Sequence, residues 1–138
     1  MSEVAANRKI VETMWEQFES DQDWSVLEAI YAPEFVRIGD KTIDRTEWFS
    51  QLKALYEAFP DHRITIHITV AEGDLVAYRW TAQATHKGAY LGAPPTGRIA
   101  QATGITISKF RDGKIIEEHA SWNKLAFLQH LGILALAR

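Results

Sequence analysis

The hydrophobic pattern of this 138-residue chain changes its period at Pro60. Before Pro60 the apolar residues recur every three to four positions, which predicts helices with one buried face. From position 63 to 70 they alternate with polar residues, which predicts a strand with one buried face. The change of period therefore predicts an α+β fold in which helices come first and a run of antiparallel strands follows.

Three helices and one short strand are predicted in the first part of the chain. The first helix covers residues 10–18, and the second follows the capping residue Asp23. After a brief strand over residues 35–38, the third helix begins after Asp44, where Glu47 completes a capping-box-like pattern. The buried faces of these helices are predicted at Ile10, Val11, Met14, Trp15, Phe18, Val26, Leu27, Ile30, Tyr31, Trp48, Phe49, Leu52, Leu55, Tyr56 and Phe59.

A sheet is predicted in the second part of the chain. Residues 87–97 hold three glycines and two prolines and predict a loop, and Arg111-Asp112-Gly113 is typical of a tight hairpin turn. A long twisted sheet with all its helices on one side curves around them, so we expect a cone-like sheet wrapped around the N-terminal helices, with a pocket between the two layers. The strands are predicted at residues 63–70, 75–86, 99–110 and 114–123, with a short helix at 125–131 and an apolar tail at 131–137.

The composition is that of one globular domain spanning residues 1–138, with 46% hydrophobic and 24% charged residues. A net charge of −3 argues against nucleic acid or an anionic membrane as a partner. The absence of cysteine excludes disulfides and thiolate chemistry. No apolar run approaches the roughly 20 residues of a membrane span. Residues 1–8 lack the apolar core of a signal peptide, so we expect a cytoplasmic location.

Known cofactor motifs are missing. The five histidines, His62, His67, His86, His119 and His130, show no HExxH spacing or other metal-binding pattern. No phosphate-binding glycine loop and no Gly-x-Ser-x-Gly elbow occurs. We therefore expect neither a metal nor an organic cofactor.

Three ionisable residues, Glu117, Glu118 and His119, lie together on the last predicted strand. Alternation sends Glu118 to one face and the other two to the opposite face. A glutamate or histidine in an apolar pocket would have a pKa suited to proton transfer near neutral pH. The alternative is that these are solvent-facing charges. His86, at the end of a strand, is likewise either a catalytic group or a partner of its own loop's backbone.

Aromatic residues could wall a pocket or simply fill the core, and the pattern leaves both readings open. Arg79 is in the same way either an anion clamp or a surface ion-pair partner. The aromatic candidates are Trp15, Phe18, Trp80, Tyr90 and Trp122.

Several segments resemble one known family. Residues 85–98 read THKGAYLGAPPTGR, residues 112–119 read DGKIIEEH and residues 128–132 read LQHLG. With this spacing they are similar to the SnoaL-like polyketide cyclases, including those called ester cyclases, over most of residues 7–132. The resemblance implies a nuclear-transport-factor-2-like cone fold, chemistry without metal or cofactor, and homodimerisation through the outer face of the sheet.

The resemblance also implies a reaction, the intramolecular aldol closure of a ring in an aromatic polyketide ester. In such cyclases an aspartate on the last strand is the acid/base, supported by a histidine on the preceding strand and an aromatic residue in the first helix. Ungapped alignment puts the aspartate at Ala120, the histidine at Thr106 and the aromatic residue at Phe18. Alanine carries no proton and threonine is no base at neutral pH, so the usual pair is missing. A β-bulge that shifts the strand by one residue would bring His119 into the pocket instead.

Two hypotheses follow. The first is an enzyme, a cyclase- or isomerase-like acid/base catalyst acting on a small apolar carbonyl compound. His119 would be its base, and Glu118 or His86 would orient that base or supply a second proton. Its pocket, of several hundred Å³ as is usual for small-molecule sites, would be walled by Trp80, Leu91 and Trp122.

The second hypothesis is a module that binds a small apolar ligand, or serves as a dimeric scaffold, without turnover. Ala120 and Thr106 at the positions of the acid/base pair favour this reading. A fold alone does not decide between the two.

Overall fold

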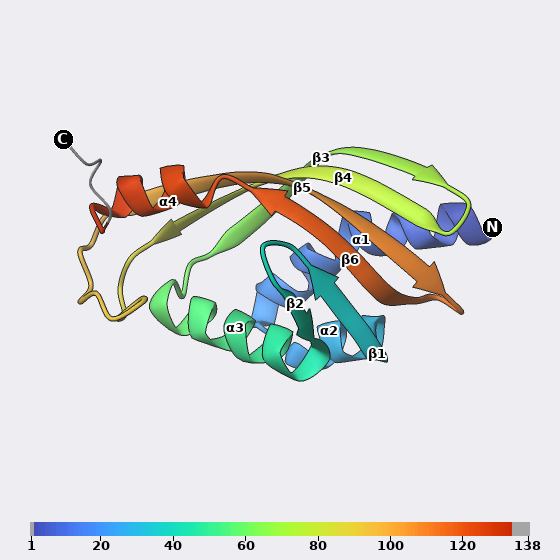
Figure 1. Ribbon diagram of the computed structural model, residues 1–138, viewed down its shortest axis with the longest axis horizontal. Helices are drawn as coiled ribbons and strands as arrows, with labels where there is room; N and C mark the ends of the chain where they lie inside the picture. Colours follow the sequence, from blue (N-terminus) through green and yellow to red (C-terminus); the bar gives the residue numbers. More distant parts are fainter. Residues whose placement is uncertain (1, 134–138) are drawn as a thin grey trace.

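The computed structural model describes residues 2–133 and contains four helices and six strands within them. The helices are α1 (Glu3–Asp21), α2 (Trp24–Ile30), α3 (Arg45–Ala58) and α4 (Lys124–Leu131). The strands are β1 (Tyr31–Ile38), β2 (Thr42–Asp44), β3 (Arg63–Glu72), β4 (Leu75–Thr85), β5 (Ile99–Arg111) and β6 (Lys114–Trp122). The predicted α+β order of helices first and strands second is confirmed (Figure 1).

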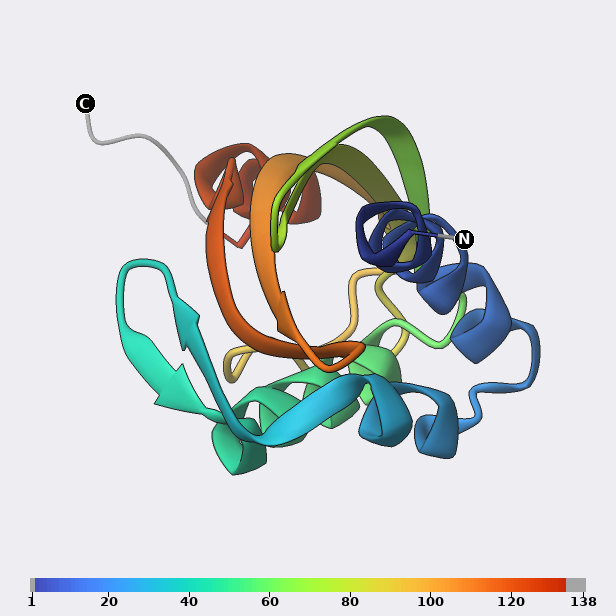
Figure 2. The same ribbon diagram turned by 90° about the vertical axis from the view of Figure 1, so that its right-hand side faces the viewer.

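The six strands form one mixed sheet in the order β2-β1-β6-β5-β4-β3. Neighbouring strands are antiparallel except for β1 and β6, which run parallel. Viewed end-on in Figure 2, the sheet curves around the interior without closing, while α1, α2 and α3 cover its open side. This is the predicted cone-like sheet wrapped around the N-terminal helices.

Local capping signals determine where the helices begin. Asp23 accepts the Ser25 N–H and Asp44 accepts the Glu47 N–H, as predicted for α2 and α3. Helix α1 starts seven residues earlier than predicted, because the Ser2 side chain caps it and its polar first turns face solvent. The predicted tail extends into residues 134–138, which lie outside the described residues.

Two clusters of buried side chains fill the space between the layers. The larger one joins α1, α2 and α3 to the sheet and includes Phe18, Leu27, Phe35 and Tyr56. The smaller one lies under α4, where the alanines of β4 and β5 leave room for aromatic rings. That cluster contains Ala58, Phe59, Ala82, Ala84, Ala100, Ala102, Phe127 and Leu131.

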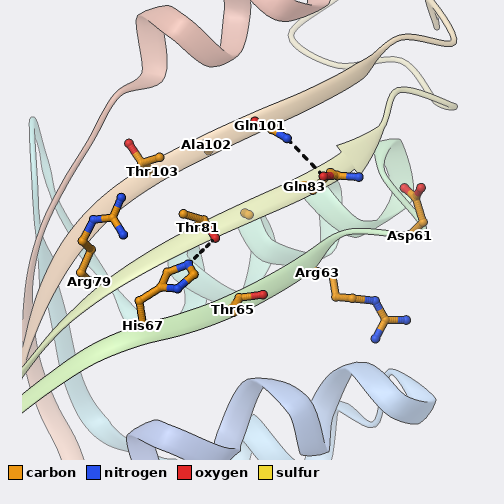
Figure 3. Close-up of a pocket in the computed structure, with 11 residues that line it drawn as sticks. Asp61, Arg63, Thr65, His67, Arg79, Thr81, Gln83, Gln101, Ala102 and Thr103 are labelled. Atoms are coloured by element: carbon orange, nitrogen blue, oxygen red, sulfur yellow. Dashed lines mark hydrogen bonds between the residues drawn. The ribbon is translucent and has the colours of Figure 1, made fainter.

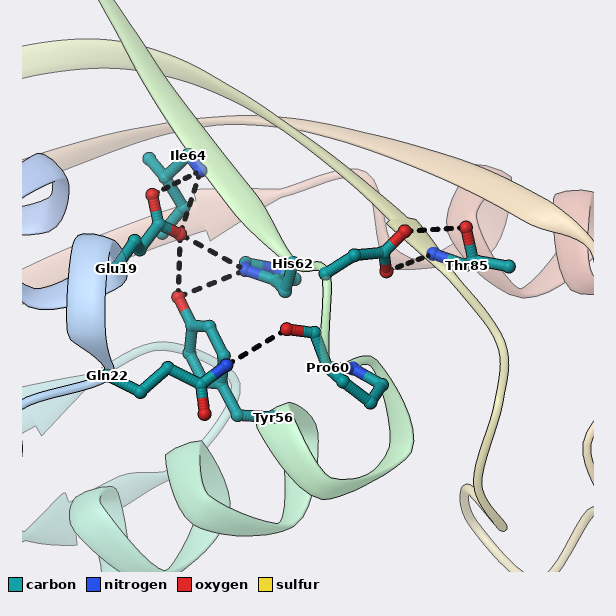
Figure 4. Close-up of polar contacts among 8 residues, drawn as sticks. Glu19, Gln22, Tyr56, Pro60, His62, Ile64 and Thr85 are labelled. Atoms are coloured by element: carbon teal, nitrogen blue, oxygen red, sulfur yellow. Dashed lines mark hydrogen bonds and ion pairs between the residues drawn. The ribbon is translucent and has the colours of Figure 1, made fainter.

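A buried polar cluster ties α1 and α3 to the start of β3 (Figure 4). The Tyr56 hydroxyl donates to a Glu19 carboxylate oxygen at 2.9 Å, and the Ile64 N–H donates to the same carboxylate at 3.1 Å. His62 Nδ1 lies 3.1 Å from the Tyr56 hydroxyl and 3.8 Å from Glu19. The carboxylate of α1 therefore accepts hydrogen bonds from α3 and from β3, at the point where helices give way to strands.

Candidate functional site

The inner face of the sheet carries a wall built from two rows of side chains in register across β4, β5 and β6. In one row Ala120 pairs with Thr106, and in the next Trp122 pairs with Gly104, which pairs with Trp80. The Trp80 indole Nε1–H donates to Thr106 Oγ1 at 3.0 Å and so links the rows. We call Trp80, Thr106, Ala120 and Trp122 the inner wall.

Gly104 allows the two indoles of the inner wall to lie side by side. A Cβ added at Gly104 would lie 2.5 Å from Trp80 Cζ2 and 2.7 Å from Trp122 Cβ, closer than real contacts allow. The indole centroids of Trp80 and Trp122 are 6.4 Å apart. The wall is thus a broad aromatic surface that only glycine at position 104 permits.

A buried carboxyl group lies in the next row. Glu118 pairs with Arg37 of β1 on one side and with Ser108 of β5 on the other. Its side chain has no exposed surface. It accepts hydrogen bonds from Arg37 Nη1 at 2.8 Å and from Ser108 Oγ at 2.7 Å, while the hydroxyls of Tyr31 and Tyr78 lie at 3.5 Å. We call these five residues the Glu118 cluster.

Burial controls the ionisation of this cluster. Loss of water raises the pKa of Glu118, and the nearby Arg37 guanidinium and Ser108 hydroxyl lower it only in part, so the pKa stays above the usual value. Burial and then the charge of Glu118 also raise the pKa of Tyr78 and of Tyr31. The tyrosines therefore remain hydroxyl donors, and the carboxyl group is more easily protonated than one in water.

Arg37 connects the Glu118 cluster with the surface. Its side chain is 16% exposed while that of Glu118 is fully buried. The guanidinium carbon lies 3.9 Å from the centre of the Trp48 ring of α3, a cation–π contact. Arg37 is therefore the charged group of the cluster that an approaching molecule meets first.

A β-bulge decides which residues of β6 face inward. The pairing of β5 with β6 shifts by one residue between Lys109–Glu117 and Phe110–Ile115, which leaves Ile116 without a partner. Both Ile115 and Glu118 are fully buried although they are three positions apart. The bulge thus directs Glu118, Ala120 and Trp122 to the inner face.

His119 consequently lies on the outer face, and its side chain is 51% exposed. It contacts Glu117 at 3.0 Å and is not next to Glu118 in space, because the two point to opposite sides of the strand. The expected shift that would bring His119 into the interior is not present, since the bulge lies before Glu117. The expected pairing of His119 with Glu118 is corrected accordingly.

His86 is buried within its own loop. Its Nδ1 accepts the Thr96 N–H at 3.2 Å and lies 3.0 Å from the Thr96 hydroxyl, while the ring stacks on Phe59. The backbone N–H of His86 donates to the Arg98 carbonyl at 2.9 Å. Among the described residues its Nε2 has no hydrogen-bond partner. These contacts match the loop-bonding alternative for His86.

Two further predicted binding residues lie elsewhere. Phe18 has no exposed surface and packs edge-on against Trp15, Trp24 and Tyr56, so it is part of the core. Leu91 is 63% exposed in the 87–97 loop. The structure therefore brings together four of the predicted residues, Trp80, Thr106, Ala120 and Trp122, with Glu118 in the neighbouring row.

The outer face of the sheet contains an open hollow of about 730 Å³ (Figure 3). We call it the outer hollow. Among the polar residues that line it, sequence analysis named Arg79 as a candidate. The alternation of Arg63, Thr65 and His67 with apolar residues predicted that these three lie on one polar face of β3. The lining residues are Asp61, Arg63, Thr65, His67, Arg79, Thr81, Ala82, Gln83, Gln101, Ala102 and Thr103.

Within residues 2–133 no three His, Asp or Glu side chains gather in a way that could hold a metal ion. In the same part of the chain no helix has the length and apolar character needed to cross a bilayer.

Comparison with known proteins identifies the family. The profile of the SnoaL-like polyketide cyclases matches residues 9–131. The chain belongs to the SnoaL-like polyketide cyclase family. Among curated proteins, no sequence matches this SnoaL-like chain significantly.

Solved structures agree with this membership. AclR from Streptomyces galilaeus, a proposed hydroxylase, is 27% identical with a TM-score of 0.88, over 96% of this chain and 99% of that one. IdmH from Streptomyces antibioticus, a proposed polyketide cyclase, is 30% identical with a TM-score of 0.80, over 91% and 98% of the two chains. A proposed SnoaL-like polyketide cyclase from Jannaschia sp. CCS1, 22% identical with a TM-score of 0.84 over 98% of both chains, shares the fold. The expected nuclear-transport-factor-2-like cone is thus confirmed.

Proposed function

We propose that this SnoaL-like chain is an acid/base catalyst of the cyclase or isomerase type, acting on a small, largely apolar, polyketide-like carbonyl compound without a cofactor. The observation that carries the proposal is Glu118, a buried carboxyl group with a raised pKa. It lies on the same face of β6 as Ala120, the position of the acid/base aspartate in the resemblance, and two residues from it. A positioned carboxyl group with a raised pKa can act first as a general base and then as a general acid.

The reaction requires proton transfer within one substrate. The Glu118 carboxylate removes a proton from carbon next to a carbonyl, and the Arg37 guanidinium stabilises the enolate oxygen that forms. The enolate carbon then bonds to a second carbonyl carbon, and the proton returns from Glu118 to the new alkoxide. Atoms and charge balance within the substrate and Glu118. Because the Arg37 side chain covers Glu118, this mechanism requires that the guanidinium move onto the substrate oxygen as it binds.

The inner wall is assigned to substrate binding. Trp80 and Trp122 border the hydrophobic clusters with their indole planes inclined at 42°, so a flat conjugated molecule that binds there would stack on one indole and meet the edge of the other. Ala120, half-buried, leaves room where a larger residue would project.

The test is the Glu118→Gln variant, assayed with a panel of polycyclic aromatic ketones that carry an enolisable side chain. Loss of a positioned acid/base predicts a fall in kcat of about 10²–10⁴-fold, while binding measured by indole fluorescence persists. His119→Ala is the control and should leave kcat unchanged. An unchanged kcat in Glu118→Gln would overturn the proposal.

Binding without turnover is a second candidate, favoured by the fully buried state of Glu118 and by Ala120 opposite Thr106. In this case the panel binds to the wild type but no compound is converted. The Ala120→Asp/Thr106→His variant would then gain activity by restoring an acid/base pair at the positions implied by the resemblance. Activity already present in the wild type would contradict this candidate.

We also propose that two copies associate through the outer face of the sheet, which exposes a run of large apolar side chains beyond the outer hollow. Sedimentation should show a dimer that Ile105→Lys converts to a monomer, and a monomeric wild type would refute this. A cytoplasmic location stays a prediction that cell fractionation can test. The exposed apolar residues are Ile68, Val70, Leu75, Ile105 and Ile107.

A further inference from the structure

The outer hollow is lined mostly by polar side chains, with Ala82 and Ala102 between them, and its rows follow the strand register. Arg63 pairs with Gln83 and Gln83 with Gln101, and in the next row Thr65, Thr81 and Thr103 lie across the three strands. Figure 3 shows these side chains on the face of the sheet that points away from α3. Hydroxyl and amide groups that converge in a hollow of about 730 Å³ fit the dimensions of a small-molecule site.

Two arginines, Arg63 and Arg79, line this hollow. Within residues 2–133 no ion pair involves Arg63 or Arg79. The acidic lining residue, Asp61, is already engaged, because its two carboxylate oxygens accept the Thr85 N–H at 2.7 Å and the Thr85 hydroxyl at 2.6 Å. The hollow therefore presents two guanidinium groups whose charge nothing in its lining offsets by direct contact.

A β-bulge adds an imidazole to the same lining. The pairing of β3 with β4 shifts between Ile66 and Ile68, so His67 is the extra residue and points outward next to Thr65. Its Nε2 lies 2.8 Å from the Thr81 hydroxyl. The bulge separates a polar end of the outer face, which holds the hollow, from the apolar end that begins at Ile68.

We propose that the outer hollow binds an elongated small molecule with two anionic groups, one held by Arg63 and the other by Arg79. Arg79 lies four residues from Gln83, the partner of Arg63, which separates the two backbone positions by about 13 Å along the sheet. Both side chains are long enough to reach inward, so the anionic groups would lie several ångströms closer together than this. Arginine forms paired hydrogen bonds with carboxylate and phosphate alike.

The ligand class is therefore a dianion with separated oxygen-rich ends, such as a linear α,ω-dicarboxylate or its carboxylate–phosphate counterpart. Thr65, His67 and Thr81 would contact the connecting part. This site is on the opposite face of the sheet from the inner wall, so its occupancy does not depend on the proposed reaction.

The test is calorimetric titration of the whole chain at low salt with linear dicarboxylates of four to ten carbons. Monocarboxylates of the same lengths and inorganic phosphate serve as comparison ligands. We expect at least one dicarboxylate to bind ten-fold or more tightly than its monocarboxylate. The ring signals of His67 should shift in its NMR spectrum as that ligand binds. Tighter binding of phosphate than of any dicarboxylate would indicate a single-anion site and overturn the proposal.

Variants locate the two ends of the ligand. Arg63→Ala and Arg79→Ala should each weaken dicarboxylate binding by ten-fold or more. Arg63→Lys should weaken it by less, because lysine keeps the positive charge but lacks the paired N–H donors of the guanidinium group. Lys41→Ala removes the same charge from an exposed turn at the other edge of the sheet and should change binding by less than two-fold. An equal loss in Lys41→Ala, no binding at all, or a dimer that buries His67 and excludes the ligand would overturn the proposal.

Discussion

Gly104 offers a direct test of the inner wall, because a single methyl group added there meets both indoles. In the Gly104→Ala variant the new Cβ would start 2.5 Å from Trp80 Cζ2, 2.8 Å from Trp80 Cε2 and 2.7 Å from Trp122 Cβ. The Gly104 backbone is not in the left-handed region, so the conformation itself suits alanine. The Trp80 indole therefore has to move, and its bond to Thr106 is lost with it.

The magnitude follows from three contributions. Overpacking a buried site costs about 1–3 kcal/mol, and losing the Trp80–Thr106 hydrogen bond costs about 1 kcal/mol. Replacing glycine by alanine inside a strand returns about 0.5–1 kcal/mol. We expect Gly104→Ala to lower the free energy of unfolding by about 2 kcal/mol, which is a large part of the typical stability of a small domain.

Urea unfolding followed by far-ultraviolet circular dichroism measures this change. Gly39→Ala is the matched control, because its added Cβ meets only a carbonyl oxygen at 3.5 Å, and it should change stability by less than about 0.5 kcal/mol. In a Trp80→Phe background the same Gly104→Ala change should cost less, because phenylalanine lacks the colliding part of the ring. A Gly104→Ala variant as stable as the wild type, or an equal cost in both backgrounds, would refute the packing proposed for the wall.

Three further predictions concern buried or hydrogen-bonded polar groups. Because the pKa of Glu118 is raised in the folded state, protonated Glu118 stabilises the fold below its unfolded pKa of about 4.3. This stabilisation is lost as the pH rises through the folded pKa. The free energy of unfolding of Glu118→Gln, measured by urea titration, should therefore rise relative to that of the wild type as the pH increases. A difference that does not depend on pH would contradict this. Hydrogen bonds from Thr85 outweigh partial burial and lower the pKa of Asp61, so Asp61 stabilises the fold above about pH 4. Asp61→Asn should be about 0.5–1 kcal/mol less stable at pH 7, with the deficit vanishing in acid; a deficit independent of pH would exclude the carboxylate as its source. Tyr56→Phe removes the bond to Glu19 and should cost about 1–2 kcal/mol in urea unfolding, against less than about 0.5 for Tyr90→Phe; equal losses would refute this.

Sequence patterns predicted those parts of the fold that local signals specify. The caps at Asp23 and Asp44 and the hairpin at 111–113 depend on residues a few positions apart, and the structure confirms them. Strand β2, three residues long, carries too short a pattern to be recognised. The parallel pairing of β1 with β6 joins residues about 80 positions apart, and neither strand's own pattern names its partner.

The face on which each side chain of β6 lies shows why the site could be predicted only in part. Alternation from Ile115 would send Glu117 and His119 inward, whereas alternation from Trp122 sends Glu118 and Ala120 inward. The sequence is compatible with both, because Ile116 is as apolar as Ile115 and nothing in it marks a bulge. Pairing with β5 decides the matter by leaving Ile116 out of register. Which side chains of β6 face inward is therefore determined by a contact between two strands, which is why the proposed acid/base group is Glu118 and not His119.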